Sequence, residues 1–370
     1  MPSATIAASV VVTPEGLLEP GEVVVDDGRI AAVRRTRGDG PVPDRVLSPG
    51  FVDLQVNGHD DVNCATADGD SWDRMDGLLL AQGVTAWCPT LVTAPLARFA
   101  SPLERIGAAM VSRRGDDGAR PEILGAHLEG PFLGGAPGAH RREHIVPIDL
   151  EWLRWLPPVV KVVTLAPELD GAREAIRLLV DKGVLVALGH STATYDEAVA
   201  GADAGARLVT HLFNGMGPLH HRAPGLVGAG LADGRLTPSL IADGVHVHPA
   251  ALRAAARAKG PGDWILVTDA VAWRDGRLEA GGERRVSIVD GAPRLADGTI
   301  AGSALTMDAA LRRAVHEAGV PLAEAVAAAA STPASLIGRP DVGRLAPGAR
   351  ADLVLLTGDL EVEEVVLARG

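Results

Sequence analysis

Short apolar stretches recur along the middle of the chain and alternate with segments of helical character. Eight stretches rich in Val, Ile, Leu and Ala begin at Gly50, Gly83, Glu122, Val159, Gly183, Ala206, Pro238 and Asp263. They lie about 20–40 residues apart, which suits one strand, one loop and one helix in each unit. The pattern predicts eight β-strands separated by helices.

Helical patterning fills the intervals between these strands and continues after the eighth. The predicted helices cover residues 71–82, 172–182, 194–205, 249–259, 306–319 and 321–338. Eight strand–helix units over about 220 residues are typical of a (β/α)8 TIM-type barrel, an α/β fold. A doubly wound open sheet is the alternative, but no G-x-G-x-x-G follows the first strand and no P-loop motif occurs.

Both ends of the chain have a different, β-like pattern. Residues 3–12 and 21–35 cluster β-branched side chains around an Asp-Asp-Gly turn, and the segment from Gly343 onward looks similar. We therefore expect a small β-sandwich domain formed by residues 1–49 and 343–370, with the barrel occupying 50–342. Hairpin-like turns are expected between the eighth strand and the next helix, over 275–303.

Composition and charge exclude several classes of protein. Apolar residues make up 47% of the 370 and charged residues 22%, which fits a globular protein with a large core. The net charge of −12 argues against nucleic acid or an anionic membrane as a partner. No signal peptide or apolar run of about 18–20 residues is evident. With only Cys64 and Cys88, no disulfide framework is expected, and a cytoplasmic location is predicted.

Polar residues gather where the predicted strands end. Glu129, His190, His211 and Asp269 end the third, fifth, sixth and eighth strands. A barrel brings these ends to one face, where active sites lie. Two histidines and a glutamate form the ligand set of a catalytic zinc with an open position, and a neighbouring acid could take a proton from water. A single such residue is often a helix cap or a structural histidine, but four at one pole favour chemistry.

Two loops contain residues suited to anions and sugars. Asn214, Gly215 and Arg222 follow the sixth strand, and Asp243, Gly244 and His246 follow the seventh. Arginine suits bidentate phosphate binding, and glycine permits close backbone approach. No role is assigned to His59 or His127.

The motifs that contain these residues form a longer series. They are PGFVDLQVNG, AHLEGPFL with GAH shortly after it, VTLAPE, GHSTATYDEA, THLFNGM, RAPGLVGAGL, ADGVH, VTDA, AGSALTMDAA, STPASLIG and LAPGARADLVLL. In this order and spacing the chain resembles the N-acetylglucosamine-6-phosphate deacetylase family of the amidohydrolase superfamily. The resemblance covers nearly the whole sequence.

The resemblance implies a role for each site residue. Glu129, His190 and His211 match the ligands of one divalent metal ion per subunit, with zinc favoured and iron, manganese or cobalt as alternatives. Asp269 matches the general base that becomes the general acid, and His140 matches a residue that contacts the sugar and helps polarise the acetyl carbonyl. Substrate contacts are implied for Ala139, His140, Asn214, Gly215, Arg222, Asp243, Gly244, His246, Ile300, Ala301 and Gly302. The resemblance also implies a homodimer in which Arg222 and His246 hold the phosphate across the interface.

One departure from the wider superfamily concerns the metal count. Many amidohydrolases have His-x-His after the first strand, where this chain has Gln55-Val56-Asn57. Neutral amides are poor zinc ligands, and Glu129 stands where others have a lysine that becomes a bridging carbamate. One tightly bound ion is therefore expected, and weak binding of a second stays open because His59 is close.

The reaction that the resemblance implies is removal of the acetyl group from N-acetyl-D-glucosamine 6-phosphate, giving D-glucosamine 6-phosphate and acetate, in amino-sugar catabolism or cell-wall recycling. The alternatives are the same chemistry on N-acetylgalactosamine 6-phosphate, another cyclic-amide or aminoacyl hydrolase of the superfamily, and a catalytically dead barrel that serves as a scaffold.

Overall fold

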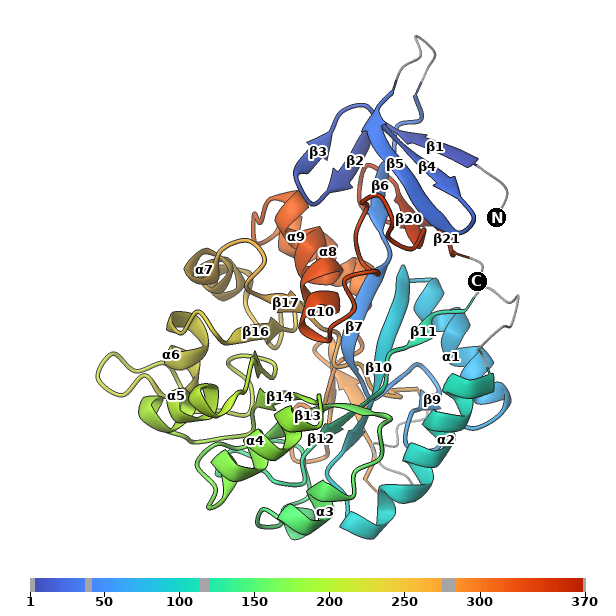
Figure 1. Cartoon of the computed structure of the whole chain (residues 1–370). Helices are drawn as coiled ribbons and strands as arrows, with labels where there is room; N and C mark the ends of the chain where they lie inside the picture. The colour runs from blue at the N-terminus through green and yellow to red at the C-terminus, as the bar shows by residue number, and fades with distance from the viewer. Residues whose placement is uncertain (1–3, 37–41, 113–119, 275–283, 369–370) are drawn as a thin grey trace.

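Parallel strands form a nearly closed barrel at the centre of the molecule, with helices around it (Figure 1). The computed structural model describes residues 4–36, 42–112, 120–274 and 284–368. In hydrogen-bonded order the barrel strands are β7 (Phe51–Val56), β10 (Val84–Val92), β12 (Ala126–Glu129), β13 (Val160–Leu165), β14 (Leu185–Leu188), β15 (Leu208–Val209), β16 (Thr237–Leu240) and β17 (Ile265–Leu266). The short β11 (Glu122–Ile123) pairs with the first half of β10. The eight predicted strands and the α/β barrel are confirmed.

The barrel closes where the end of the eighth strand returns to the first. Val56 and Ala270 form an isolated parallel bridge, and the Asp269 N–H donates to the Gln55 carbonyl over 2.9 Å. Nearer the start of β7, the Thr268 hydroxyl donates to Asp53 Oδ2 over 2.6 Å. All six residues of β7 are buried, as expected for a barrel strand covered on both faces.

Helices pack around the strands and bury part of their surface against them. They are α1 (Asp70–Leu80), α2 (Ala100–Ser112), α3 (Leu150–Arg154), α4 (Ala172–Asp181), α5 (Tyr195–Ala204), α6 (Gly225–Ala232), α7 (Pro249–Lys259), α8 (Met307–His316), α9 (Leu322–Ala329) and α10 (Ser331–Leu336). All six predicted helical segments are present, and the last is divided into α9 and α10 at Ala330. Helices α2, α3 and α6 were not predicted. Among the described residues, no helix has the length and apolar character needed to cross a membrane.

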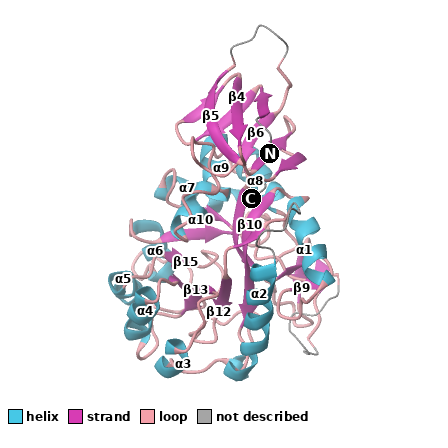
Figure 2. Ribbon diagram, turned by 45° about the vertical axis from the view of Figure 1, so that its right-hand side comes forward, coloured by secondary structure: helices cyan, strands magenta, loops and turns pink. Residues whose placement is uncertain are grey.

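Strands from both ends of the chain form a small β-domain at one end of the barrel (Figure 2). One sheet contains β1 (Ala4–Ala8), β4 (Gly21–Asp26) and β5 (Arg29–Arg35). The other has the order β21 (Val362–Val366), β20 (Leu353–Leu356), β6 (Val46–Pro49), β2 (Val10–Thr13) and β3 (Gly16–Leu18). Val11, Val23, Ile30, Leu47 and Leu353 belong to its separate apolar core. Because β6 continues into β7, this domain lies at the end of the barrel where β7 begins.

Two small hairpins accompany the barrel. β8 (Gly58–His59) pairs with β9 (Val62–Asn63) directly after the first strand. β18 (Ser287–Val289) pairs with β19 (Ala292–Arg294) inside the segment for which hairpin turns were predicted. Residues 275–283 of that prediction lie outside the described residues.

Candidate active site

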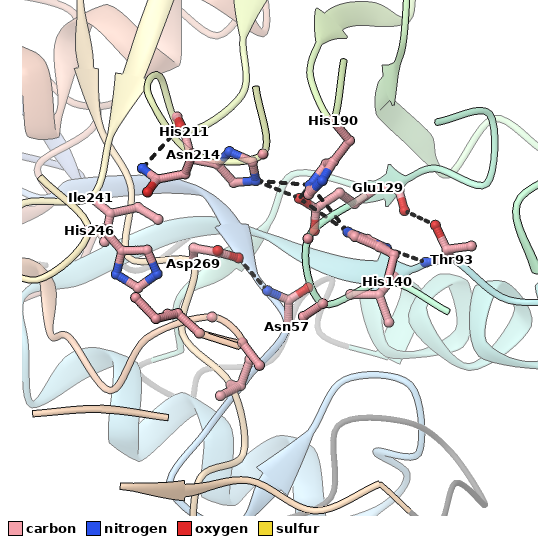
Figure 3. A pocket seen from close by; sticks show the side chains of 18 of the residues that line it. Asn57, Thr93, Glu129, His140, His190, His211, Asn214, Ile241, His246 and Asp269 are labelled. Carbon is pink, nitrogen blue, oxygen red and sulfur yellow. Dashed lines mark hydrogen bonds and ion pairs between the residues drawn. The ribbon is translucent and has the colours of Figure 1, made fainter. Parts of the chain in front are cut away.

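A cavity of about 190 Å³ opens at the carboxyl ends of the barrel strands (Figure 3). Glu129 is the last residue of β12, and His190, His211 and Asp269 follow β14, β15 and β17. All four side chains line the cavity, although each residue is at most 7% exposed. The strands therefore deliver the four predicted residues to one place.

Three of these residues have a backbone conformation that side chains disfavour. The φ angles of His190, His211 and Asp269 are 50°, 31° and 49°, in the left-handed region. Such residues cost free energy and persist only where the surroundings fix them. Here the carbonyls of His190 and Asp269 accept hydrogen bonds from the N–H groups of Gly134 and Ser303, over 2.8 and 2.9 Å. The His211 N–H donates to the Ser239 hydroxyl over 2.7 Å.

The ring nitrogens of two histidines converge on one carboxylate oxygen. Glu129 Oε1 lies 2.9 Å from His190 Nε2 and 3.0 Å from His211 Nε2, and the two nitrogens are 3.1 Å apart. A tetrahedral zinc with bonds of about 2.0–2.1 Å would separate its ligands by about 3.3 Å. The donor set and its spacing therefore fit a small divalent ion.

Charges in this cluster also suit a metal ion. Burial alone would raise the pKa of Glu129, but the contacts with His140, His190 and His211 hold it well below its usual range. Burial, together with the neighbouring His140, lowers the pKa of His190 to about 4. The Nδ1–H of His190 faces the Ala136 carbonyl at 3.3 Å, which leaves the Nε2 lone pair directed at the cluster. A carboxylate and a neutral imidazole are the forms that metals bind.

His140 reaches the same cluster from the loop after β12. Its Nε2 lies 3.2 Å from His190 Nε2 and 3.8 Å from Glu129 Oε1, so these three side chains also form a group that could hold a metal ion. The Thr93 N–H donates to His140 Nδ1 over 3.4 Å. Because Nδ1 is then an acceptor, the ring proton is on Nε2, directed at the cavity.

Asp269 faces the cluster from the other side and is held by two carboxamides. Asn57 Nδ2 and Gln55 Nε2 donate to its Oδ1 over 2.6 and 3.1 Å, and Gln55 Nε2 also donates to Glu129 Oε1 over 3.0 Å. Burial, and then the charge of Glu129, raise the pKa of Asp269 to about 8. A carboxyl group with such a pKa can both accept and release a proton near neutral pH.

Most of the predicted substrate contacts line the cavity. They are Ala139, His140, Asn214, Gly215, His246, Ile300, Ala301 and Gly302. Asp243 and Gly244 are not part of the lining, but Asp243 Oδ2 lies 2.6 Å from His246 Nδ1 and so orients that ring. Arg222 is exposed, beside His221, and is also outside the lining.

His246 lies well inside the chain. Its side chain is only 6% exposed and lines the cavity of its own chain. The prediction that His246 holds the phosphate across a subunit interface stays a prediction.

Several functional neighbours were not predicted. The sequence identified Gln55 and Asn57 only as poor zinc ligands, and Thr93 and Arg284 line the cavity without any local motif. The two carboxamides could have been found from their position, two residues apart after the first strand. Thr93 acts through its backbone N–H, which no sequence pattern reveals.

His59 and His127, to which the sequence assigned no role, are structural neighbours of the site. His127 is inside the barrel, with Nδ1 2.9 Å from the Leu54 carbonyl and Nε2 2.8 Å from the Thr164 hydroxyl, and burial lowers its pKa to about 4. His59 is buried in β8, and burial lowers its pKa as well. Neither residue lines the cavity.

Comparisons with known proteins agree with this geometry. Residues 46–368 match the sequence profile of the amidohydrolase family. The chain is 40% identical to N-acetylgalactosamine-6-phosphate deacetylase of Escherichia coli O157:H7, over 95% of each chain. It is 38% identical to human N-acetylglucosamine-6-phosphate deacetylase, over 95% of this chain and 88% of the relative.

A solved structure shares the whole architecture. It is a mutant of N-acetyl-D-glucosamine-6-phosphate deacetylase from Mycobacterium smegmatis, in complex with N-acetyl-D-glucosamine-6-phosphate. The two chains are 34% identical and superpose with a TM-score of 0.89, over 100% of this chain and 99% of the other.

Proposed function

The chain belongs to the amidohydrolase family, and we propose that it hydrolyses the acetamide of N-acetyl-D-glucosamine 6-phosphate to D-glucosamine 6-phosphate and acetate. The observation that carries the proposal is the pairing, in one cavity, of a His₂Glu cluster with the buried Asp269. Amide hydrolysis needs an activated water, a stabilised oxyanion and a proton for the departing amine. The described residues can supply each of these.

We assign the metal to Glu129, His190 and His211, as one divalent ion per subunit with zinc favoured. The three donor atoms are mutually 2.9–3.1 Å apart. When bound, such an ion would acidify a water molecule and polarise the amide carbonyl. Affinity order alone does not select zinc over iron, manganese or cobalt.

His140 is better suited to the substrate carbonyl than to the metal. The Thr93 N–H occupies Nδ1, so Nε2 carries a proton and has no lone pair to offer an ion. A protonated nitrogen directed into the cavity donates instead to an oxygen that gains negative charge. We therefore assign His140 to stabilisation of the oxyanion.

Asp269 moves the proton. Both carboxamide hydrogen bonds fall on Oδ1, so Oδ2 is the oxygen that takes a proton from water and later gives it to the amine. Its pKa, raised to about 8 by burial and the Glu129 charge, fits both steps. Gln55 Nε2 donates hydrogen bonds to both Asp269 and Glu129. In amidohydrolases with His-x-His a second ion would lie at this place, so the hydrogen bonds support a single metal here.

The sugar and its phosphate would contact the rest of the lining. We assign Ala139, Asn214, Gly215, His246 and the backbone of 300–302 to the sugar phosphate, with Asp243 and Gly244 shaping the turn before His246. Arg284 is the only Lys or Arg within the described lining. Because Arg222 lies outside its own cavity, we propose a homodimer in which Arg222 reaches the partner's phosphate.

We also propose that the enzyme is cytoplasmic, as its two unpaired, buried cysteines allow.

The test is acetate release from the phosphorylated amino sugar by the purified, metal-loaded protein. We expect turnover that is lost after dialysis against a chelator and restored by a divalent ion. No turnover of N-acetyl-D-glucosamine 6-phosphate by the metal-loaded protein would reject this proposal, and no turnover of either epimer would favour the inactive scaffold.

The galactosamine epimer is the second candidate, because one relative carries that name. The human relative and the ligand complex name glucosamine, which is why we favour it. Turnover of both 6-phosphates under identical conditions decides: a higher kcat/KM for the galactosamine compound would overturn our choice.

A further inference from the structure

One carboxylate outside the cavity connects three of the loops around it. Glu168 follows β13, and its Oε1 accepts the N–H of Thr192 over 2.8 Å and of Gly135 over 3.3 Å. Its Oε2 accepts the Ser191 hydroxyl over 2.6 Å. The side chain therefore joins the loops that follow β12, β13 and β14.

The residues that Glu168 holds are close to the reacting groups along the chain. Ser191 and Thr192 directly follow His190, and Gly135 is five residues before His140. The approach is tight, because a Cβ built on Gly134 would be 1.9 Å from Glu168 Oε1. Only glycine allows the His140 loop to come this near to the carboxylate.

His190 needs such support because of its backbone. With φ at 50°, it has a conformation that must be imposed by its neighbours. Its own carbonyl is held by the Gly134 N–H over 2.8 Å, and the next two residues are held by Glu168. The turn at His190 is therefore held on both sides. The loop that bears His140 holds its carbonyl, and Glu168, which also binds that loop, holds the two residues that follow.

We propose that Glu168 is a positioning residue that sets His190 and His140 relative to each other. The inference rests on the proposed function, in which His190 binds the metal and His140 the carbonyl oxygen. Glu168 does not line the cavity, so it acts through these two residues and not on the substrate.

The test compares Glu168→Ala with the wild-type protein after loading with cobalt(II), whose visible absorption spectrum reports ligand geometry. We expect an altered cobalt spectrum and a kcat about 10–100-fold lower, the usual cost of losing an outer partner of a metal ligand. KM should change by less than about threefold, because Glu168 does not contact the substrate.

Two further variants separate positioning from a loss of stability. Glu168→Gln keeps an acceptor for the two N–H groups and should recover most of kcat. Glu197→Ala removes the acceptor for the Thr194 N–H, 2.8 Å away at the start of α5, and weakens the same region without contact to the His190 turn. It should keep the wild-type spectrum and kcat.

The outcomes are distinct for the two proposals. A Glu168→Ala protein with the cobalt spectrum and kcat of the Glu197→Ala protein would overturn the positioning role. A wild-type protein that releases no acetate would reject the proposed function, while the cobalt spectra would still report whether Glu168 shapes the His190 turn.

Discussion

Asp269 and its two amide donors form the smallest unit with a defined chemical role. Asn57 and Gln55 both direct an N–H at Oδ1. An amide donor stabilises the oxygen that stays unprotonated, so the proton is confined to the other oxygen. In the proposed reaction, the pair therefore fixes which atom of Asp269 would transfer the proton.

Replacing Asp269 by Asn should abolish most turnover while leaving the metal in place. The Asn carbonyl oxygen can accept the same two hydrogen bonds, so the change removes proton transfer and little else. We expect kcat to fall by a factor of about 10²–10⁴, with unchanged metal content by elemental analysis. Near-normal kcat would remove Asp269 from the reaction.

At this scale the sequence predicted which strand-end residues share the cavity better than it predicted their hydrogen-bond partners. Glu129, His190, His211 and Asp269 could be found because strand ends in a barrel share one face. The Gln55 bridge and the Thr93 contact could not, because both depend on the relative depth of strands that are distant in sequence. The positive φ of His190 is likewise a result of packing and cannot be predicted from the type of residue.

Among the elements, β7 departs from an apolar barrel strand at Asp53 and Gln55. Asp53 at its centre is fully buried and accepts hydrogen bonds from the Thr268 hydroxyl and the Gln55 N–H. Burial raises its pKa to about 7 in spite of these bonds. The carboxyl therefore ties β7 to the last barrel strand at the closure point.

Asp53→Asn should become more stable relative to the wild type as pH rises. The folded-state pKa of about 7 exceeds the unfolded value near 3.9, so folding takes up a proton at pH values between these two. The wild type therefore loses stability as pH rises through 7. Asn cannot ionise. Between pH 5 and 8 the difference in unfolding free energy should shift by about 3 kcal/mol towards the variant.

Denaturant unfolding at the two pH values measures this shift. Asp70→Asn, at the exposed start of α1, controls for the loss of one negative charge from a protein with a net charge of −12. A shift of equal size in both variants would mean that Asp53 is not the group responsible.

The prediction of elements was weakest where packing overrides propensity. Residues 225–232 form α6 although three of them are glycines, which disfavour helices in isolation. A Cβ at Gly230 would come within 2.9 Å of Leu212, so the small residues serve close packing against the barrel. The periodic helices α4 and α7, in contrast, were predicted within one residue of their ends.

At the scale of the whole molecule, the position of Arg222 does not suit a contact with a ligand in the cavity of its own chain. It is exposed in the loop before α6 and does not line the cavity, whereas the proposed substrate contains a phosphate. A second copy related by twofold symmetry could present this guanidinium to the first copy's site. The sequence placed Arg222 in a loop suited to ligand contacts. It could not predict that Arg222 lies outside the cavity of its own chain.

Mixing two variants that are each impaired at a different residue tests this arrangement. Arg222→Ala should raise KM for the phosphorylated sugar far more than for N-acetylglucosamine. If Arg222 acts across a dimer, equal amounts of Arg222→Ala and Asp269→Asn subunits, after exchange, should regain about one quarter of wild-type activity per subunit. Activity no greater than that of the separate variants would place Arg222 in its own chain's site or outside any site.

The small β-domain also constrains the order in which the protein can be completed during synthesis. Strand β6 pairs with β2 on one side and with β20 on the other, and about three hundred residues separate β6 from β20. On the ribosome, β6 therefore keeps one open edge until Leu353–Leu356 have been made. An open edge is a template for pairing with other chains, so the nascent protein is exposed to misassembly for most of its translation.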